Sequence, residues 1–324
     1  MNQTLEIKNK KKKDGYFKTQ FKNLRKNVSI IYFLLPAILL ALFFGYLPMI
    51  GATWAFREEV SQVNWLYDTL TFTNGWTFDH IVGIFVDETT GPEIFGALGN
   101  TLIISCIKIL IIFPMTIIFA IFLSEIKNSF ISKLVLIILC LPNFLSWPVT
   151  INIWVNVFDF INKTLGDWGL ITKPILFFDS FFKPLVIFLS IWKGLGWSSI
   201  FFYSAIMSID KEYYEAATID GANKVQKIWY LTIPGILPVI ALQLVMNITY
   251  ILDAGFDQIY SMFTVTNDDF SQDILGTLIY RYTMSGNQGI PEVVGLSVLN
   301  GLLALILMLT GNAVVKKYFG RSLW

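Results

Sequence analysis

The sequence contains few charged residues for its length. Only 15% of its 324 residues are Asp, Glu, Lys or Arg, whereas about 25% is usual in a soluble domain. Hydrophobic residues make up 55% of the chain and aromatic residues 16%. A soluble protein of this composition would expose large apolar patches, which soluble monomers rarely do. The composition therefore argues against a soluble globular protein and against disorder, and it favours a protein embedded in a membrane.

Residues that bind metals or form disulfides are also scarce. The two cysteines, Cys106 and Cys140, lie inside apolar runs, so we expect buried or lipid-facing thiols rather than a disulfide. The single histidine, His80, cannot form a histidine-based metal site by itself. The sequence has neither a nucleophile–base constellation nor a G-x-x-x-x-G-K-[ST] phosphate loop. We therefore expect no catalytic residues, no metal site and no ATP bound by this chain.

Long apolar runs are what the sequence has instead. A transmembrane helix needs about 20 mostly apolar residues, and six segments meet this requirement: 30–56, 97–124, 131–157, 184–208, 236–258 and 292–315. Several prolines and glycines lie inside these segments, but membrane helices tolerate such residues. The predicted fold is therefore an all-α polytopic membrane protein with six transmembrane helices.

The lysines and arginines are distributed unevenly between the segments that connect the spans. With the N-terminus in the cytoplasm, the cytoplasmic segments hold 17 of them and the outer segments hold five. Cytoplasmic loops of membrane proteins contain the excess of basic residues. Both termini are therefore predicted to lie in the cytoplasm.

Nine of these basic residues lie within the N-terminal tail, residues 1–29. Apolar side chains recur there at helical spacing between the basic ones: Phe17, Phe21, Leu24 and Val28. This pattern is typical of an amphipathic helix that lies on a lipid surface, and a solvated basic tail is the alternative. A basic tail ahead of an apolar chain also indicates a membrane anchor rather than a nucleic-acid-binding arm. We divide the chain into this tail and a six-span domain, residues 30–324.

The cytoplasmic loop between the fourth and fifth spans, residues 209–235, has signals for two short helices. Asp210 can cap the first helix, and Gly221 can end it because glycine tolerates a left-handed conformation. A second helical piece follows from Asn223, and Pro234 opens the fifth span. A short helix of this kind can dock in a groove of a partner, and an ordinary connector is the alternative. The side of the first helix holds Tyr214, Ala217 and Thr218.

The same loop resembles the EAA loop of bacterial ABC-importer permeases. The family pattern is E-A-A, three residues, G, nine residues and I-x-L-P. This chain has the same spacing in Glu215-Ala216-Ala217, Gly221 and Leu231-Thr232-Ile233-Pro234, with Asp220 also as in the family. Over about residues 30–320, the chain resembles the maltose-type sugar permeases, particularly those of polysaccharide and complex-oligosaccharide importers such as alginate importers. The motifs behind this wider resemblance are Asn100-Thr101-Leu102 and Leu141-Pro142.

This resemblance implies one passive half of a translocation channel that an ATPase drives. The implied partners are a second homologous permease, two cytoplasmic ATPase subunits that bind ATP and Mg, and an extracytoplasmic solute-binding protein. The implied location is a bacterial cytoplasmic (inner) membrane. Glu215 would reach a basic residue of the ATPase, the two alanines would allow close packing, and Gly221 would set the bend. The residues assigned to ATPase coupling are Tyr214, Glu215, Ala216, Ala217, Asp220, Gly221 and Pro234.

Polar and aromatic residues inside the spans predict a route for a sugar, which proteins bind through hydrogen bonds and aromatic faces. Polar groups in a span are costly and usually face the bundle interior or a watery cavity. The fifth span would place one stripe on a single helical face: Gln243, Asn247, Tyr250, Ala254 and Asp257. The third and fourth spans contribute Asn152, Asn156, Trp192, Lys193 and Trp197. The alternative is that these side chains only hydrogen-bond helices to one another.

Apart from Lys133 at the very start of the third span, two lysines lie inside the predicted spans, Lys108 and Lys193. Their charge would suit an anionic sugar such as a uronate. Lysines near span ends also extend harmlessly to the membrane surface, so this support for an anionic substrate is weak.

Two other classes of function stay open from the sequence alone. An ion-gradient-driven secondary transporter or channel would need inverted repeats or a buried carboxylate relay. The chain has no convincing repeat, and only Asp253 and Asp257 lie near one span end. A membrane enzyme is disfavoured because no catalytic constellation is present.

Overall fold

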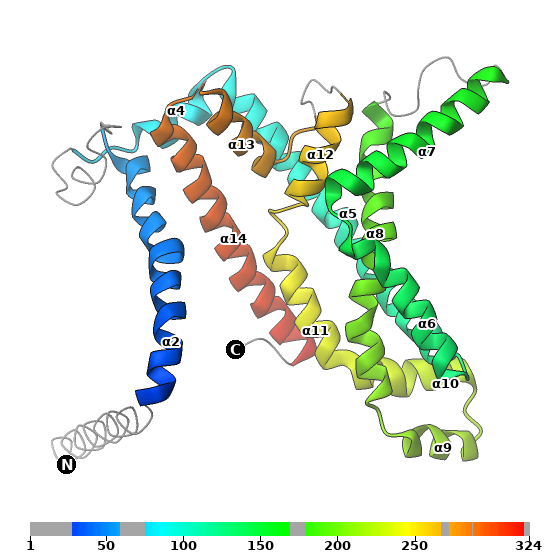
Figure 1. Cartoon of the computed structure of the whole chain (residues 1–324). Coiled ribbons are helices and arrows are strands. Elements are labelled where there is room, and N and C mark those ends of the chain that lie inside the picture. The colour runs from blue at the N-terminus through cyan, green and yellow to red at the C-terminus, as the bar shows by residue number, and fades with distance from the viewer. Residues whose placement is uncertain (1–27, 59–74, 169–178, 267–271, 287, 321–324) are drawn as a thin grey trace, which may run out of the picture. The chain divides into compact units, whose positions relative to one another are not determined.

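The computed structural model describes five stretches of the chain: residues 28–58, 75–168, 179–266, 272–286 and 288–320. Nearly all of these residues are helical (Figure 1), and one isolated bridge, between Arg57 and Trp76, is the only β-type pairing among them. Most of the predicted amphipathic helix of the tail lies outside the described residues. The chain divides into two compact units, Met1–Phe78 and Asp79–Trp324.

The first unit contains one apolar helical run. α2 (Val28–Leu40) continues directly into the π-helix η1 (Ala41–Tyr46) and the 3-10 helix η2 (Leu47–Phe56). Pro48 has no N–H group, so the α-helical ladder loses a hydrogen bond here and the pattern changes. The run Tyr32–Phe56 is long and apolar enough to cross a membrane, which confirms the first predicted span.

The second unit contains the other described helices. In chain order they are α4 (Asp79–Val86), α5 (Thr90–Ser124), α6 (Ser129–Cys140), η3 (Leu141–Phe144), α7 (Trp147–Asp167), α8 (Asp179–Met207), α9 (Lys211–Ile219), α10 (Lys224–Lys227), η5 (Ile228–Thr232), α11 (Ile233–Thr249), α12 (Phe256–Thr266), α13 (Leu275–Ser285) and α14 (Ile290–Phe319). Among the described residues of the whole chain, five helices could cross a membrane, or six if the bent pair α6–α7 is one span. This agrees with the six predicted spans. α5 begins before its predicted span, and α14 extends beyond its own at both ends.

The third predicted span, 131–157, is not one continuous helix. α6 and η3 end at Phe144, and α7 follows after a bend of 101°. Leu145 and Ser146 are extended at this bend. Pro148 explains the break, because it has no N–H group to donate to the carbonyl of Phe144 one turn earlier. The prediction of one continuous helix over this span is therefore wrong.

The fifth predicted span, 236–258, also breaks. α11 ends before the segment 250–255, and α12 begins after it. Ala254 has φ of 48° and Gly255 has φ of 90°, and left-handed residues cannot continue a right-handed helix. In the described part of the chain, Ala254 is the only non-glycine residue with positive φ. The prediction of one polar face along this span is therefore wrong, because Asp257 lies on α12.

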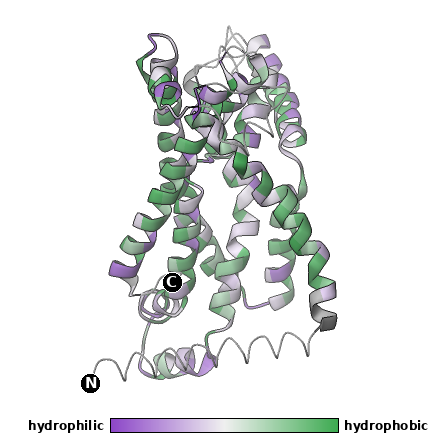
Figure 2. Ribbon diagram, turned by 90° about the vertical axis from the view of Figure 1, so that its left-hand side faces the viewer, coloured by the Kyte–Doolittle hydropathy of each residue, from purple (hydrophilic) through white to green (hydrophobic). Residues whose placement is uncertain are grey.

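The helices α5 and α8 pack along each other in the centre of the second unit. Phe202 of α8 contacts Phe113 of α5 edge to face, and the Ser199 hydroxyl donates to the carbonyl of Thr116 at 3.2 Å. α11 adds Ile236, which is fully buried, to this cluster. Elsewhere the long helices consist largely of hydrophobic residues (Figure 2), and many of their apolar side chains are exposed. Exposed apolar side chains on helices of this length fit a surface that faces lipid.

Candidate functional site

The helix α9 is closed at both ends by the residues that the sequence indicates. The Asp210 carboxylate accepts the N–H of Glu212 at 3.1 Å. At the other end, the N–H of Ala222 donates to the carbonyl of Ala217 at 2.9 Å. This is the long hydrogen bond of a Schellman motif, in which the residue after the cap is left-handed. Gly221 supplies that conformation with φ of 79°, so the predicted start and end of the helix are confirmed.

The second helical piece runs directly into the fifth span. Asn223 and Gln226 form a capping box at the start of α10: each side chain accepts the main-chain N–H of the other, at 2.8 and 2.9 Å. The π-helix η5 follows, and Pro234 lies in the first turn of α11. π-helical turns are rare and frequently occur at functional sites. The first predicted short helix is therefore confirmed, whereas the second is the beginning of a helical run that continues to Thr249.

One pair of hydroxyl groups joins α9 to the start of the fifth span. Tyr214 Oη lies 2.9 Å from Thr232 Oγ1, and Thr232 is buried within η5. Lys227 Nζ also donates to Thr218 Oγ1 at 2.7 Å. Thr232 is not among the residues predicted from the sequence, because it occupies the variable position of the I-x-L-P anchor.

Most of the other side chains of α9 are exposed, with Ala217 half-buried. Glu215 and Ala216 are exposed, and Tyr213 and Ile219 are 63% and 86% exposed. Figure 1 shows α9 lying beyond the ends of α8 and α10. Large apolar side chains beside a carboxylate fit a surface that another protein covers.

The polar residues predicted on the fifth span lie on two helices. On α11, Asn247 is exposed, and its Nδ2 donates to the carbonyl of Gln243 at 2.8 Å. Tyr250 caps the C-terminal end of α11 and is 63% exposed. Asp257 is exposed in the first turn of α12. Gln243 and Asn247 therefore share a helix face that Asp257 does not continue.

The helix α7 presents a second pair of amides. Asn152 Nδ2 donates to the carbonyl of Pro148 at 2.8 Å, and Asn156 Nδ2 donates to the carbonyl of Asn152 at 2.7 Å. Both side chains are exposed. Since an amide has a second N–H and an oxygen as well, each keeps hydrogen-bonding capacity for another partner.

The three predicted path residues of α8 have different surroundings. Trp192 packs edge to face with Trp154, with 5.6 Å between ring centroids. Trp197 packs edge to face with Phe144 at 5.9 Å and remains 42% exposed. Lys193 is buried against the bend between α6 and α7. Trp197 therefore retains an accessible aromatic face, whereas Lys193 contacts the protein itself.

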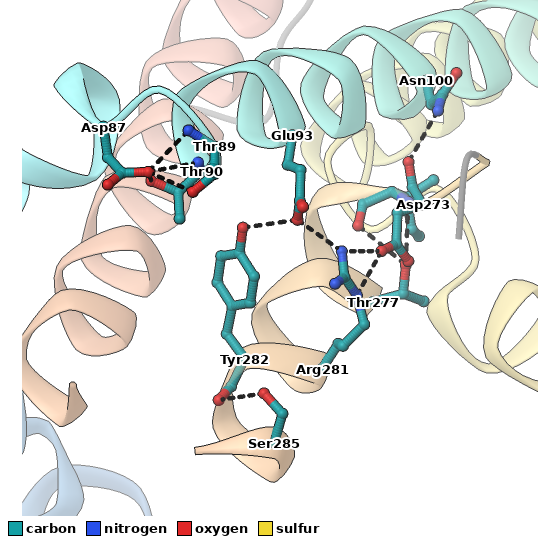
Figure 3. Close-up of polar contacts among 11 residues, drawn as sticks. Asp87, Thr89, Thr90, Glu93, Asn100, Asp273, Thr277, Arg281, Tyr282 and Ser285 are labelled. Atoms are coloured by element: carbon teal, nitrogen blue, oxygen red, sulfur yellow. Dashed lines mark hydrogen bonds and ion pairs between the residues drawn. The ribbon is translucent and has the colours of Figure 1, made fainter. Parts of the chain in front are cut away.

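At the end of the unit opposite α9, charged side chains join α13 to α5 (Figure 3). Arg281 lies between two carboxylates, with its Nη2 at 3.0 Å from Glu93 and 2.9 Å from Asp273. Tyr282 Oη donates to the same Glu93 carboxylate at 2.9 Å. Burial raises the pKa of Asp273, and hydrogen bonds from Thr277 and Arg281 oppose that rise. The contacts of Arg281 and Tyr282 with Glu93 therefore fix α13 to α5, and the pair with Asp273 fixes the segment before α13 to the same helix.

The first turn of α5 is held by a carboxylate that precedes it. Asp87 Oδ1 accepts the main-chain N–H groups of Thr89 and Thr90, each at 2.9 Å, and the hydroxyl of Thr89 (Figure 3). These hydrogen bonds, chiefly the one from the Thr89 hydroxyl, lower the pKa of Asp87 to about 2. An anion at a helix N-terminus is favourable, so Asp87 stabilises the start of this span.

Two residues of the Asn100-Thr101-Leu102 motif connect α5 to the start of α13. Asn100 Nδ2 donates to the carbonyl of Asp273 at 3.0 Å (Figure 3), and Thr101 Oγ1 accepts the N–H of Leu275 at 2.8 Å. The motif therefore holds together segments that are far apart in the sequence.

A family profile covers most of the second unit. The family of binding-protein-dependent transport system inner membrane components matches residues 112–320. The chain belongs to this family. The matched part of the permease includes all of the loop 209–235 and both helices of the broken fifth span.

Two relatives from Bacillus subtilis (strain 168) align with nearly the whole permease. The polygalacturonan/rhamnogalacturonan transport system permease protein YteP is 30% identical over 296 residues, which cover 88% of this chain and 87% of YteP. Protein LplB is 29% identical over 307 residues, which cover 91% of each chain.

Two solved structures share the fold of the permease. One is a bacterial ABC transporter involved in the import of the acidic polysaccharide alginate, with 30% identity, a TM-score of 0.79 and coverage of 92% of this chain and 98% of that chain. The other is a bacterial alginate ABC transporter in complex with an alginate pentasaccharide-bound periplasmic protein, with 30% identity, a TM-score of 0.78 and coverage of 93% and 99%. The comparisons confirm the predicted fold class and the resemblance to sugar-type ABC permeases. They also confirm a multi-pass transport subunit of the inner membrane.

Proposed function

We propose that this permease forms half of the translocation path of an ATP-driven importer of oligosaccharides or polysaccharides. The relative YteP is named for polygalacturonan and rhamnogalacturonan transport, and both structural neighbours are alginate transporters. Polygalacturonan and alginate are both chains of uronate sugars. A uronate-containing oligosaccharide is therefore the first substrate class to test.

The orientation follows from charge. The cytoplasmic segments contain 17 Lys and Arg residues against five outside, so α9 and both termini belong in the cytoplasm and α13 belongs at the outer surface. This orientation exposes α9 to cytoplasmic ATPase subunits and α13 to an extracytoplasmic solute-binding protein. Membrane lipid and a second homologous permease would cover the exposed apolar sides of the spans.

The observation that carries the proposal is the geometry of α9. It is a short helix, capped at both ends, with exposed Glu215 and Ile219 and a hydrogen bond between the hydroxyls of Tyr214 and Thr232, which begins the fifth span. Such a helix suits docking in a groove of a partner. Two ATPase subunits would bind and hydrolyse ATP with Mg, one on this helix and one on the equivalent helix of the second permease.

The sugar route would use exposed and half-buried polar and aromatic residues of the spans. Its proposed members are Gln243, Asn247 and Tyr250 on α11, Asp257 on α12, Asn152 and Asn156 on α7, and Trp192 and Trp197 on α8. The amides can donate to and accept from sugar hydroxyls. The exposed face of Trp197 can pack against a sugar ring.

A pair of matched charge removals on α9 tests the coupling role. Glu215→Gln and Glu212→Gln both remove one exposed carboxylate from the same helix. In the reconstituted complex, Glu215→Gln should lower substrate-stimulated ATP hydrolysis by about tenfold, as expected for one lost charge-assisted hydrogen bond. Glu212→Gln should leave it nearly unchanged. Equal stimulation in both variants would show that Glu215 does not contact the ATPase.

A further inference from the structure

The lysine of α8 that lies deep in the spans contacts main-chain carbonyls at a break. Lys193 is only 7% exposed. Its Nζ donates to the carbonyls of Pro142 at 3.4 Å, Asn143 at 2.9 Å and Leu145. These carbonyls belong to η3 and to the bend between α6 and α7. An ammonium has three N–H donors, so the chain itself occupies all three.

The lysine of α5 makes a corresponding contact at the break between α11 and α12. Lys108 Nζ donates to the carbonyl of Ala254 at 2.8 Å and to Gln258 Oε1 at 3.0 Å. Gln258 is fully buried. Its Oε1 also accepts the Ser190 hydroxyl at 2.9 Å, and its Nε2 donates to the carbonyl of Val186 at 2.7 Å. Lys108 is therefore connected to both α12 and α8 at the break.

Both ammonium groups lie where the backbone approaches closely. A Cβ on Gly255 would lie 2.7 Å from Lys108 Nζ. Gly196 lies on α8 three residues after Lys193. A Cβ on Gly196 would lie 2.3 Å from the carbonyl oxygen of Leu139. Glycine at these two positions leaves room for the ammonium of Lys108 and for the contact of α8 with the end of α6. The close packing leaves no space for a sugar between either lysine and its carbonyls.

The lysines and the breaks compensate each other electrostatically. A break in a membrane helix frees carbonyl groups that lipid cannot hydrogen-bond, which is costly. A buried ammonium without acceptors is equally unfavourable. At the end of η3, carbonyl groups at a helix C-terminus also attract the cation of Lys193. Each lysine therefore stabilises one break, and each break stabilises the charge of one buried or half-buried lysine.

We propose that Lys108 and Lys193 are positioning residues that hold the two breaks and fix the direction of the helices that follow them. The proposal rests on the proposed function, because Asn156 on α7 and Asp257 on α12 are exposed residues of the sugar route. It assigns the lysines to the chain's own carbonyls instead of to an anionic sugar.

Cysteine reactivity in the complete transporter complex tests each break separately. In a Cys106→Ser background, the reporters Asn156→Cys and Asp257→Cys react with a small water-soluble methanethiosulfonate at a rate that depends on the direction of α7 and α12. Lys193→Met removes the donors of the first break and should change the rate at the Asn156 reporter by about tenfold. Lys108→Met should do the same at the Asp257 reporter. In each variant the other reporter should change much less.

Three further variants make the test specific. Lys133→Met, the same substitution at an exposed lysine of α6, should change neither rate. Glutamine keeps N–H donors. In Lys193→Gln and Lys108→Gln, the reporter cysteines should therefore react at rates closer to those measured with both lysines present. Equal changes at both reporters in both methionine variants, or no change at either, overturn the proposal.

Assembly and the proposed function are judged independently. If a methionine variant does not assemble into the complex, the glutamine variant of the same lysine is measured in its place. If the glutamine variant does not assemble either, the positioning role is overturned. In the complex that keeps both lysines, the reporters should respond to ATP. Absence of that response contradicts the proposed function and leaves the comparison between the lysine variants valid.

Discussion

The hydroxyl groups of Tyr214 and Thr232 lie 2.9 Å apart and join the exposed helix α9 to the π-helix that begins the fifth span. Thr232 is buried, whereas most of α9 is exposed. A displacement of α9 by a docked partner therefore has a direct hydrogen-bonded connection to the membrane helices. The proposed coupling depends on this connection as much as on the docking surface.

Removing either hydroxyl should weaken coupling. Tyr214→Phe and Thr232→Val each delete one partner of a bond that contributes about 0.5–1.5 kcal/mol, so each should lower substrate-stimulated ATP hydrolysis by roughly threefold to tenfold. The double variant should lose no more than either single variant, because the two groups share one interaction. Tyr213→Phe, at an exposed neighbouring tyrosine, is the control. Additive losses in the double variant would show that the two hydroxyls act separately.

The end of α9 should depend on backbone conformation at Gly221. Its φ of 79° is strained for a β-branched residue, and a Cβ there would meet no atom within 4 Å. Gly221→Val should therefore lower stimulated hydrolysis through a strain of about 1–2 kcal/mol, while membrane insertion stays intact. Gly221→Asn should preserve hydrolysis, since asparagine tolerates this conformation. An equal loss of stimulated hydrolysis in both variants would show that any side chain at position 221 disturbs the docking surface, and that backbone strain is not the cause.

The amide stripe of α11 should be accessible to water. In a Cys106→Ser background, Asn247→Cys should react with polar thiol reagents, and substrate or ATP-driven closure should protect it. Val245→Cys should stay inert, because Val245 is fully buried. Asn247→Ala should weaken transport by roughly tenfold or less, the loss of one hydrogen bond. Equal labelling at both positions would show that the polar side chains of α11 only pack against other helices and do not line a water-filled route.

The ion pairs of Arg281 with Glu93 of α5 and with Asp273, just before α13, should stabilise the end of the permease that contains α13. Arg281→Met leaves Asp273, which is only 4% exposed, without its cation. We expect a destabilisation of about 1–3 kcal/mol, visible as a lower midpoint of thermal unfolding in detergent. Adding Asp273→Asn should recover part of the loss, since an unpaired buried charge costs more than a neutral amide. A further drop in the double variant would contradict this account.

Local features of this permease could be predicted because their causes are local. Apolar runs of sufficient length predict spans, Asp210 predicts a helix start, and Gly221 predicts a helix end. The spacing around Glu215 further predicts the membership that the family match confirms.

The breaks and the contacts across them could not be predicted in the same way. Proline and glycine are common in unbroken membrane helices, so Pro148 and Gly255 gave no clear signal. The contact of Lys193 with Asn143 joins residues 50 positions apart, and that of Lys108 with Ala254 spans 146 positions. Such pairs depend on how the helices pack, which periodicity within one helix does not encode.

Energy dependence of uptake tests the central claim most directly. Proteoliposomes would contain this permease, its partner permease, the ATPase subunits and the solute-binding protein, with radiolabelled oligogalacturonides or alginate oligosaccharides outside. Uptake should require ATP on the ATPase side and should persist when ionophores dissipate the ion gradients. Uptake that proceeds without ATP and stops when the gradients are dissipated would contradict the account and identify a secondary transporter.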